Sequence, residues 1–172
     1  MKPGVDTAQT TWELEQMLKV FEQIQPRTVL EIGIWKGGTL WHWLEPGDIT
    51  VVAVDDTMRD PGPDVWQEWA NQAGSTLHLI KGSSQDQMVV EDVAAFAPFQ
   101  FALIDGDHTY ESVKEDWLNY GPMVDGVVCF HDIVPRPGYG VSELWGEIQA
   151  EYRTVEFIDG TGVYNGIGVV YL

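Results

Sequence analysis

Two short segments of this sequence carry acids and imidazoles at spacings that suit chemistry on a small molecule. The first contains Asp105, Asp107 and His108, and the second contains His131 and Asp132. Each segment directly follows an apolar run of strand length. We therefore expect both segments to end neighbouring strands and their side chains to meet at one opening at the edge of the sheet. An imidazole with a pKa of about 6.5 is suited to accept a proton at neutral pH. The alternative is a loop that only caps the helix after it.

A glycine-rich turn follows an earlier apolar run and contains Glu31, Gly33, Trp35 and Gly37. Glycines at such a turn let a ligand approach the backbone at the start of a helix. A dinucleotide-binding fingerprint beginning at Gly33 would need a glycine where Trp35 stands, so the sequence argues against NAD. The phosphate-binding GK[ST] motif is also absent from the sequence. The same glycines could equally serve the geometry of a turn alone.

Further polar residues follow the next two strands. Asp55 stands where a carboxylate can accept hydrogen bonds from both hydroxyls of a ribose. The following strand leads into short polar side chains that could hydrogen-bond the edge of an adenine: Gly82, Ser83, Ser84, Gln85 and Asp86. Both places also have a simpler interpretation as helix caps, the second by Ser83 or Ser84. Together with the glycine turn they predict a pocket for an adenosine with no required phosphate.

The apolar periodicity alternates between helix and strand along the chain. It predicts helices over residues 10–25, 39–44, 64–73, 84–96, 109–120 and 141–151. It predicts strands over residues 28–33, 50–55, 76–80, 99–105 and 123–130, followed by an antiparallel pair at 152–158 and 166–172. The fold class is therefore α/β: a single doubly wound, Rossmann-like, mostly parallel sheet with helices on both faces and a C-terminal antiparallel hairpin.

Length and composition predict one domain over residues 1–172, with residues 1–9 as a flexible start. The chain has 27 acidic and 9 basic residues and a net charge of -18, so we expect neither nucleic acid nor an anionic membrane as a partner. No apolar run has the length of a signal peptide or a membrane span, and we expect a cytoplasmic protein. The single cysteine, Cys129, lies in an apolar run and is expected to be a buried structural thiol.

From the first helix to the final hairpin, the chain resembles the class I S-adenosylmethionine-dependent methyltransferases. The glycine turn resembles the family's first motif, Asp55 its ribose-binding acid, and the segment 82–86 the adenine side of catechol-type O-methyltransferases. Asp56 departs from the family, which usually has an apolar residue there, and Met58 or another loop residue is expected to supply that contact. The resemblance implies S-adenosylmethionine as cofactor, bound by Glu31, Gly33, Trp35, Gly37, Asp55, Gly82, Ser83, Ser84, Gln85 and Asp105.

The acids and imidazoles resemble the site of metal-dependent O-methyltransferases, including the macrocin type. The resemblance implies that Asp105 and Asp132 bind a divalent cation and that His131 occupies the third ligand position. It also implies that His108 is the general base, working with Asp105. A histidine ligand departs from the family pattern, because imidazole is a poor ligand for Mg²⁺ and a normal one for Zn²⁺, Mn²⁺ or Fe²⁺. The sequence leaves open which metal binds, or whether one binds.

The resemblance leads to the hypothesis of an enzyme that methylates the hydroxyl of a small acceptor, a sugar or a phenol. Two alternatives stay open: a role of the same fold in hydroxylation, and a non-catalytic cofactor-binding module that partners another subunit. No extra lid domain is evident, so the acceptor must be selected by short loops or by a neighbouring subunit of a homo-oligomer. Arg136 and Tyr139 lie in a loop that could close over the acceptor, although a plain connector fits equally well.

Overall fold

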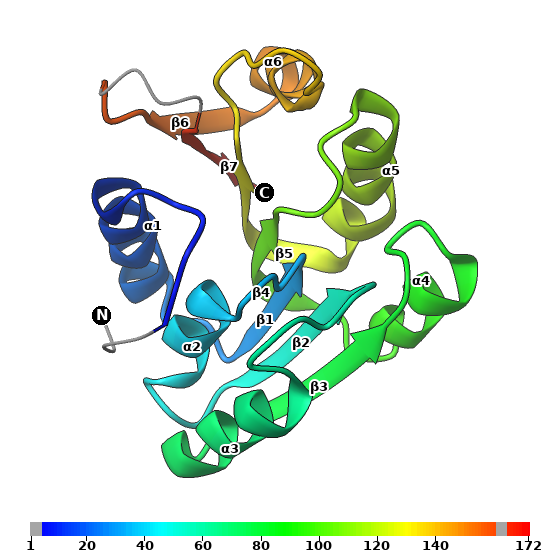
Figure 1. Ribbon diagram of the computed structural model, residues 1–172. Helices are drawn as coiled ribbons and strands as arrows, with labels where there is room; N and C mark the ends of the chain where they lie inside the picture. The colour runs from blue at the N-terminus through cyan, green and yellow to red at the C-terminus, as the bar shows by residue number, and fades with distance from the viewer. Residues whose placement is uncertain (1–4, 161–164) are drawn as a thin grey trace.

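Parallel strands alternate with helices along most of the chain (Figure 1). The computed structural model describes residues 5–160 and 165–172. The helices are α1 (Thr11–Ile24), α2 (Gly38–Leu44), α3 (Pro63–Ala73), α4 (Gln87–Ala94), α5 (Tyr110–Tyr120), the short 3-10 helix η1 (Gly121–Met123) and α6 (Val141–Glu151). The strands are β1 (Thr28–Ile32), β2 (Thr50–Asp55), β3 (Thr76–Lys81), β4 (Phe99–Ile104), β5 (Val124–His131), β6 (Arg153–Phe157) and β7 (Ile167–Tyr171).

The strands form a seven-stranded sheet in the order β3-β2-β1-β4-β5-β7-β6. The strands β1 to β5 pair in parallel, and β7 pairs antiparallel with both β5 and β6. The predicted doubly wound sheet and its C-terminal antiparallel pair are thereby confirmed. After β3 the chain returns and places β4 on the other side of β1. This reversal is the switch point at which ligands of doubly wound sheets bind.

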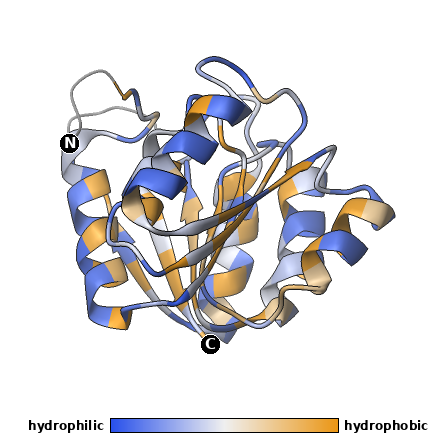
Figure 2. Cartoon of the chain, turned by 90° about the horizontal axis from the view of Figure 1, so that it is seen from below, coloured by the Kyte–Doolittle hydropathy of each residue, from blue (hydrophilic) through white to orange (hydrophobic). Residues whose placement is uncertain are grey.

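Two hydrophobic cores cover the two faces of the sheet, because successive strand residues point to opposite sides. On β1, Val29 belongs to the core formed with α1, α2 and α3. Leu30 and Ile32, on the opposite face of the same strand, belong to the core formed with α4, α5 and α6. Figure 2 shows that the helices carry both hydrophilic and hydrophobic residues, as helices do when only one side packs against a sheet.

The helix α4 begins later than predicted. The sequence predicts a start at residue 84 with Ser83 or Ser84 as the cap, whereas α4 starts at Gln87. Its N-cap is Asp86, whose carboxylate accepts a hydrogen bond of 2.9 Å from the Met88 amide. The predicted cap was wrong because the carboxylate takes this role. The two serines therefore remain in the loop that follows β3.

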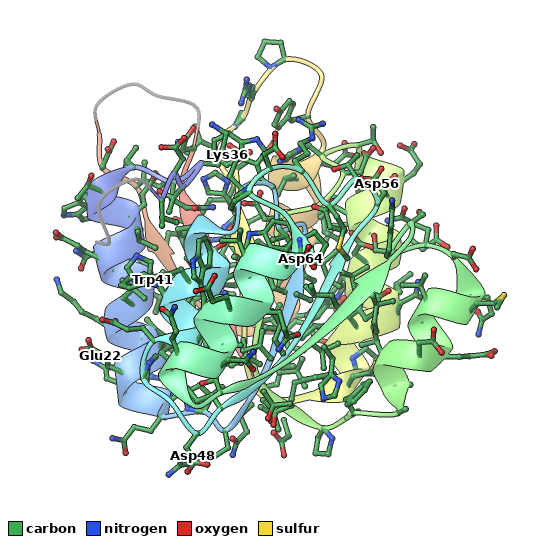
Figure 3. The ribbon with its side chains drawn as sticks, turned by 60° about the horizontal axis from the view of Figure 1, so that its bottom comes forward. Glu22, Lys36, Trp41, Asp48, Asp56 and Asp64 are labelled. Carbon is green, nitrogen blue, oxygen red and sulfur yellow. The ribbon has the colours of Figure 1, made fainter. Side chains whose placement is uncertain are left out.

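The carboxyl ends of the parallel strands lie along one edge of the sheet. In Figure 3, Lys36 and Asp56, which follow β1 and β2, lie on the opposite side of the molecule from Asp48, which precedes β2. The segment before α1 reaches the same edge, where Asp6 forms a 2.7 Å ion pair with Lys36. Of the predicted flexible start, residues 1–4 lie outside the described residues, as do residues 161–164 of the predicted hairpin turn.

In the described part of the chain, no helix combines the length and the apolar character that crossing a bilayer requires.

Candidate functional site

A cavity of about 540 Å³ opens at the switch point. Its walls come mainly from the loops that follow β1 to β5, as expected for a doubly wound sheet. Most of the predicted site residues line it: Gly33, Trp35, Asp55, Gly82, Ser83, Ser84, Gln85, Asp105, His108, His131 and Asp132. The structure therefore brings the residues predicted for adenosine and the acids and imidazoles into one cavity.

Two of the predicted cofactor residues, Glu31 and Gly37, do not line the cavity. The Glu31 side chain is fully buried and accepts a hydrogen bond from the hydroxyl of Thr39 in α2. Gly37 has a φ of 78° and lies against the indole of Trp66. Glu31 thus links β1 to α2, whereas Gly37, the N-cap of α2, lies against α3. Burial raises the pKa of Glu31 to about 8, against the opposing hydrogen bond from Thr39, so this carboxyl is neutral at pH 7.

We expect Glu31→Gln to retain the fold and to flatten the pH dependence of its stability. The unfolded chain loses the Glu31 proton near the ordinary pKa of 4.5, whereas the folded chain keeps it to about pH 8. Since the folded state binds more protons in this window, the wild-type free energy of unfolding falls as pH rises, by at most about 1.4 kcal/mol per pH unit. Glutamine cannot titrate and removes this contribution. Urea unfolding of both proteins at pH 5 and pH 8 measures how far the free energy of unfolding changes with pH in each. An equal change in the two proteins would refute the raised pKa of Glu31.

The backbone at Gly33 is in close contact with the end of β4. Gly33 has a φ of 90°, in the left-handed region that favours glycine. A Cβ atom at this position would collide with the backbone carbonyl of Asp105, only 2.7 Å from its carbon. The glycine turn and the acid-bearing strand end thus form a tightly packed floor for the cavity.

The Asp55 carboxylate anchors the glycine turn. Its Oδ2 accepts hydrogen bonds from the amides of Ile34, at 2.9 Å, and Trp35, at 3.2 Å. Its Oδ1 accepts hydrogen bonds from the amide and hydroxyl of Thr57 and from the amide of Met58. Burial raises the pKa of Asp55, but these donors outweigh burial and hold it below its ordinary range. Both oxygens are therefore engaged within the chain.

The loop after Asp55 presents polar side chains to the cavity. The expected apolar contact from Met58 is not seen, because Met58 packs against the core under α1 to α3 and is not part of the lining. Asp56, Thr57 and Arg59 line the wall instead. The Asp56 side chain is exposed, so this wall carries a carboxylate that water can reach.

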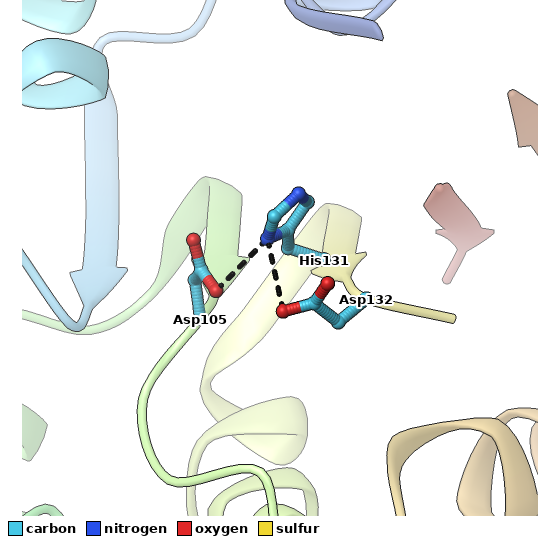
Figure 4. A group of neighbouring side chains, drawn as sticks. All are labelled: Asp105, His131 and Asp132. Carbon is cyan, nitrogen blue, oxygen red and sulfur yellow. Dashed lines mark hydrogen bonds and ion pairs between the residues drawn. The ribbon is translucent and has the colours of Figure 1, made fainter. Parts of the chain in front are cut away.

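The acids and imidazoles at the ends of β4 and β5 form one cluster. The Nδ1 atom of His131 lies 3.2 Å from Asp105 Oδ1 and 3.5 Å from Asp132 Oδ2 (Figure 4). The Nε2 atom of His108 lies 3.0 Å from Asp132 Oδ2 and 3.5 Å from Asp105 Oδ1. Two imidazoles thus share two carboxylates. Asp132 also has a φ of 59°, a backbone conformation that non-glycine residues seldom adopt and that is found at functional sites.

The shared carboxylates set the protonation of this cluster. Burial raises the pKa of Asp105, but His131 and His108 outweigh burial and lower it to about 2. Burial lowers the pKa of His108, yet the hydrogen bonds and charges of Asp105 and Asp132 raise it to about 9. The pKa of His131 is likewise raised, because Asp105 and Asp132 outweigh burial. With no further cation in the cluster, His108 is protonated at neutral pH and cannot accept a proton.

The donor atoms of the cluster fit a divalent cation. Among the described residues, one ligand atom each from Asp105, His131 and Asp132 lies within 4.8 Å of the other two. In the same part of the chain, Asp132 Oδ1 and His131 Nε2 are buried without a hydrogen-bond partner. Two carboxylates with one imidazole suit Mn²⁺, Fe²⁺ or Zn²⁺ better than Mg²⁺, which prefers oxygen ligands.

Gln9 contacts this cluster and was missed by the sequence analysis. Its side-chain amide donates a 2.8 Å hydrogen bond to Asp105 Oδ2, and the residue is only 6% exposed. The adjacent Ala8 lines the cavity, and its carbonyl accepts a 3.5 Å hydrogen bond from the Asn165 side chain. No sequence signal marks Gln9, because it lies outside every predicted functional motif and 96 positions from Asp105.

The loop between β5 and α6 covers the imidazole of His108. Tyr139 stacks on His108 with ring centres 4.4 Å apart, and the Arg136 guanidinium lies 4.3 Å from the Tyr139 ring centre. The Gly140 amide donates a 2.7 Å hydrogen bond to the His108 carbonyl. Arg136 and Tyr139 both line the cavity, in the place expected for contacts with an acceptor.

Residues 30–133 match the family described as "Methyltransferase domain". The fold is similar to that of the O-methyltransferase from Bacillus cereus in complex with SAH, with a TM-score of 0.70 at 18% identity, over 99% of this chain and 84% of that chain. It is also similar to MycE methyltransferase from the mycinamycin biosynthetic pathway, in complex with Mg and SAH, with a TM-score of 0.63 at 19% identity. That match covers 91% of this chain and 48% of that chain.

Sequence relatives are much longer than this chain. The Dol-P-Man:Man(7)GlcNAc(2)-PP-Dol alpha-1,6-mannosyltransferase of Drosophila melanogaster is 32% identical over 99 residues, which are 56% of this chain and 14% of that protein. The uncharacterized protein y4gI of Sinorhizobium fredii is 26% identical over 165 residues, covering 86% of this chain and 17% of that protein. The chain thus spans less than a fifth of either relative.

Proposed function

Because the chain belongs to the methyltransferase domain family, we propose that it transfers the methyl group of S-adenosylmethionine to the hydroxyl of a small molecule, a sugar or a phenol. The observation that carries this proposal is the single cavity that joins Gln85 and the loop after Asp55 to the acid–imidazole cluster. Methyl transfer needs an acceptor oxygen held in line with the methyl group, and such positioning is worth several kcal/mol. One cavity with two chemically different ends can hold both reactants.

The cofactor is assigned to the half of the cavity formed by the loops after β1, β2 and β3. Gly33 lines this half of the cavity, at the end of β1 in the turn that leads into α2. Ser83 and Gln85 supply polar atoms for an adenine edge, and Asp56 an exposed carboxylate for a ribose. Trp35 is 38% exposed at the same wall and offers an indole to cover the bound cofactor.

The acceptor is assigned to the half formed by the loops after β4 and β5, with His108 as the base. Tyr139 holds the His108 ring by stacking, and Asp132 lies 3.0 Å from its Nε2 atom. A divalent cation held by Asp105, His131 and Asp132 would supply charge that lowers the pKa of an acceptor hydroxyl and offsets the carboxylates beside His108. His108 could then take up the hydroxyl proton near neutral pH.

We expect S-adenosylmethionine and its demethylated product SAH to raise the melting temperature of the protein, and NAD to leave it unchanged. A ligand that binds only the folded state, at about 100 times its Kd, adds about 2.7 kcal/mol to the free energy of unfolding. Thermal unfolding monitored by fluorescence or calorimetry measures the shift.

Stabilisation by NAD alone would overturn the proposed cofactor. Transfer of a radiolabelled methyl group can then be screened over small hydroxyl compounds, with and without Mn²⁺. Tight cofactor binding with no transfer to any compound would favour the non-catalytic module instead.

A further inference from the structure

Asp116 is a buried carboxylate in α5 that the proposed function leaves unused. The residue is 0% exposed and does not line the cavity. Its Oδ1 accepts a 2.7 Å hydrogen bond from Nε2 of Gln85, which does line the cavity. Burying a carboxylate is unfavourable unless the group is hydrogen-bonded. Its place beneath a cavity residue therefore suggests a role that acts through Gln85.

Tyr120 lies one helical turn after Asp116 and contacts the same loop. Residues four positions apart share one side of a helix. The Tyr120 hydroxyl donates a 2.7 Å hydrogen bond to the backbone carbonyl of Ser84. Thus α5 holds the loop after β3 in two ways, its backbone through Tyr120 and the Gln85 side chain through Asp116.

The direction of the Gln85 amide depends on Asp116. Nε2 also donates to the Ser84 hydroxyl at 2.8 Å, and Oε1 accepts from the Ser83 hydroxyl at 2.8 Å. Hydroxyls both donate and accept, so the two serines would tolerate either direction of the amide. An ionised carboxylate only accepts, and it requires the NH₂ group to face it. Burial raises the pKa of Asp116 to about 6 against its hydrogen bonds with Ser84 and Gln85, so it is ionised at pH 8.

We propose that Asp116 is a positioning residue that makes the cavity selective for adenine, by fixing Gln85 with its amide oxygen available to the ligand. After accepting from Ser83, Oε1 keeps one lone pair that can accept from the 6-amino group of adenine. The same oxygen repels a base that carries a carbonyl oxygen at that position. The inference rests on the proposed function, because it presupposes a cofactor that contains adenine.

The experiment compares SAH with its inosyl analogue, in which a carbonyl oxygen replaces the 6-amino group, by calorimetric titration at pH 8. We expect the wild-type protein to bind SAH at least about 30-fold more tightly than it binds the inosyl analogue. In Asp116→Asn a neutral amide can face Gln85 with either of its ends, so the preference should fall to about 3-fold. The matched control is Tyr120→Phe, which loosens the loop and should weaken both ligands equally, with the 30-fold preference retained.

Two results would overturn the role of Asp116. In the first, Asp116→Asn keeps the full preference for SAH over the inosyl analogue. In the second, Tyr120→Phe loses as much of this preference as Asp116→Asn does. If Asp116→Asn does not fold, Asp116→Leu removes the acceptor with a side chain of similar size and must show the same fall. Failure of the wild-type protein to bind SAH overturns the proposed function, whereas tight SAH binding with an unchanged preference overturns only this inference.

Discussion

Replacing Asp105 by alanine is expected to reduce methyl transfer by about 10³-fold, with a much smaller effect on SAH binding. Asp105 lies beside both His131 and His108 and accepts a hydrogen bond from Gln9, so its loss disorders the base and the cation ligands together. The substitution also removes one of the three ligands proposed for the cation, and we expect Mn²⁺ affinity to fall at least about tenfold. Steady-state kinetics with S-adenosylmethionine and calorimetric titration with Mn²⁺ measure the two losses.

Asp125→Asn is the matched control for this substitution. Asp125 is an exposed acid at the other end of β5, and its neutralisation should leave turnover and Mn²⁺ affinity at wild-type levels. Unchanged Mn²⁺ binding and turnover in a folded Asp105→Ala protein would refute the cation site. Lost Mn²⁺ binding with full turnover would refute only the link between the cation and methyl transfer.

Gly33→Ala is expected to lower the free energy of unfolding by about 3 kcal/mol or more and to remove SAH binding. The left-handed φ of 90° disfavours any side chain, and the added methyl group would meet the backbone carbonyl of Asp105. Because the added methyl group would meet backbone and not a flexible side chain, no rotamer change could relieve the collision. The ends of β1 and β4 would have to separate at the floor of the cavity. Urea unfolding and calorimetric titration with SAH measure the two effects.

Gly74→Ala separates the collision from the backbone strain. Gly74 ends α3 with a φ of 74°, and an added Cβ there meets nothing within 4 Å. This variant should therefore be destabilised by only about 1 kcal/mol and should bind SAH normally. Equal losses of stability in the two variants would show that conformational strain, and not contact between the glycine turn and Asp105, explains the effect.

The layered sheet was predictable because buried parallel strands need apolar residues on both faces. The strand Thr50–Asp55 shows this most clearly, since its central residues pack alternately into the two cores. The end of α3 was predictable from Gly74, which adopts the left-handed conformation that ends a helix. The alignment of five strand ends then places Asp55, Gln85, Asp105 and His131 along one edge. These relations are local in sequence or follow from the winding of the sheet.

Contacts between distant segments could not be predicted in the same way. Gln9 meets Asp105 only because the segment before α1 crosses the strand ends, and Asp116 meets Gln85 only through the packing of α5. Two of the hydrogen bonds to Asp55, those from the amides of Ile34 and Trp35, likewise depend on how the loop after β1 folds against the end of β2. Glu31 matched a motif, yet its side chain points into the α2 face of the sheet, where its carboxyl oxygen accepts a hydrogen bond from the Thr39 hydroxyl. Motif spacing carries no information about these tertiary contacts.

The position of β7 also determines when the proposed site can be completed during synthesis. His131 ends β5. On the side of β5 that faces away from β4, its register partner is Ile167 of β7. A ribosome releases residues 28–104 well before residues 167–171, so the strands that carry the glycine turn can assemble while the outer edge of β5 is still open. The pairing of His131 with Ile167, and the hydrogen bond from the Ile133 amide to the Gly166 carbonyl just after Asp132, form only after β7 has emerged and inserted between β5 and β6. A nascent chain stalled before β7 should therefore bind Mn²⁺ much more weakly than the complete chain does, with a smaller loss of SAH binding.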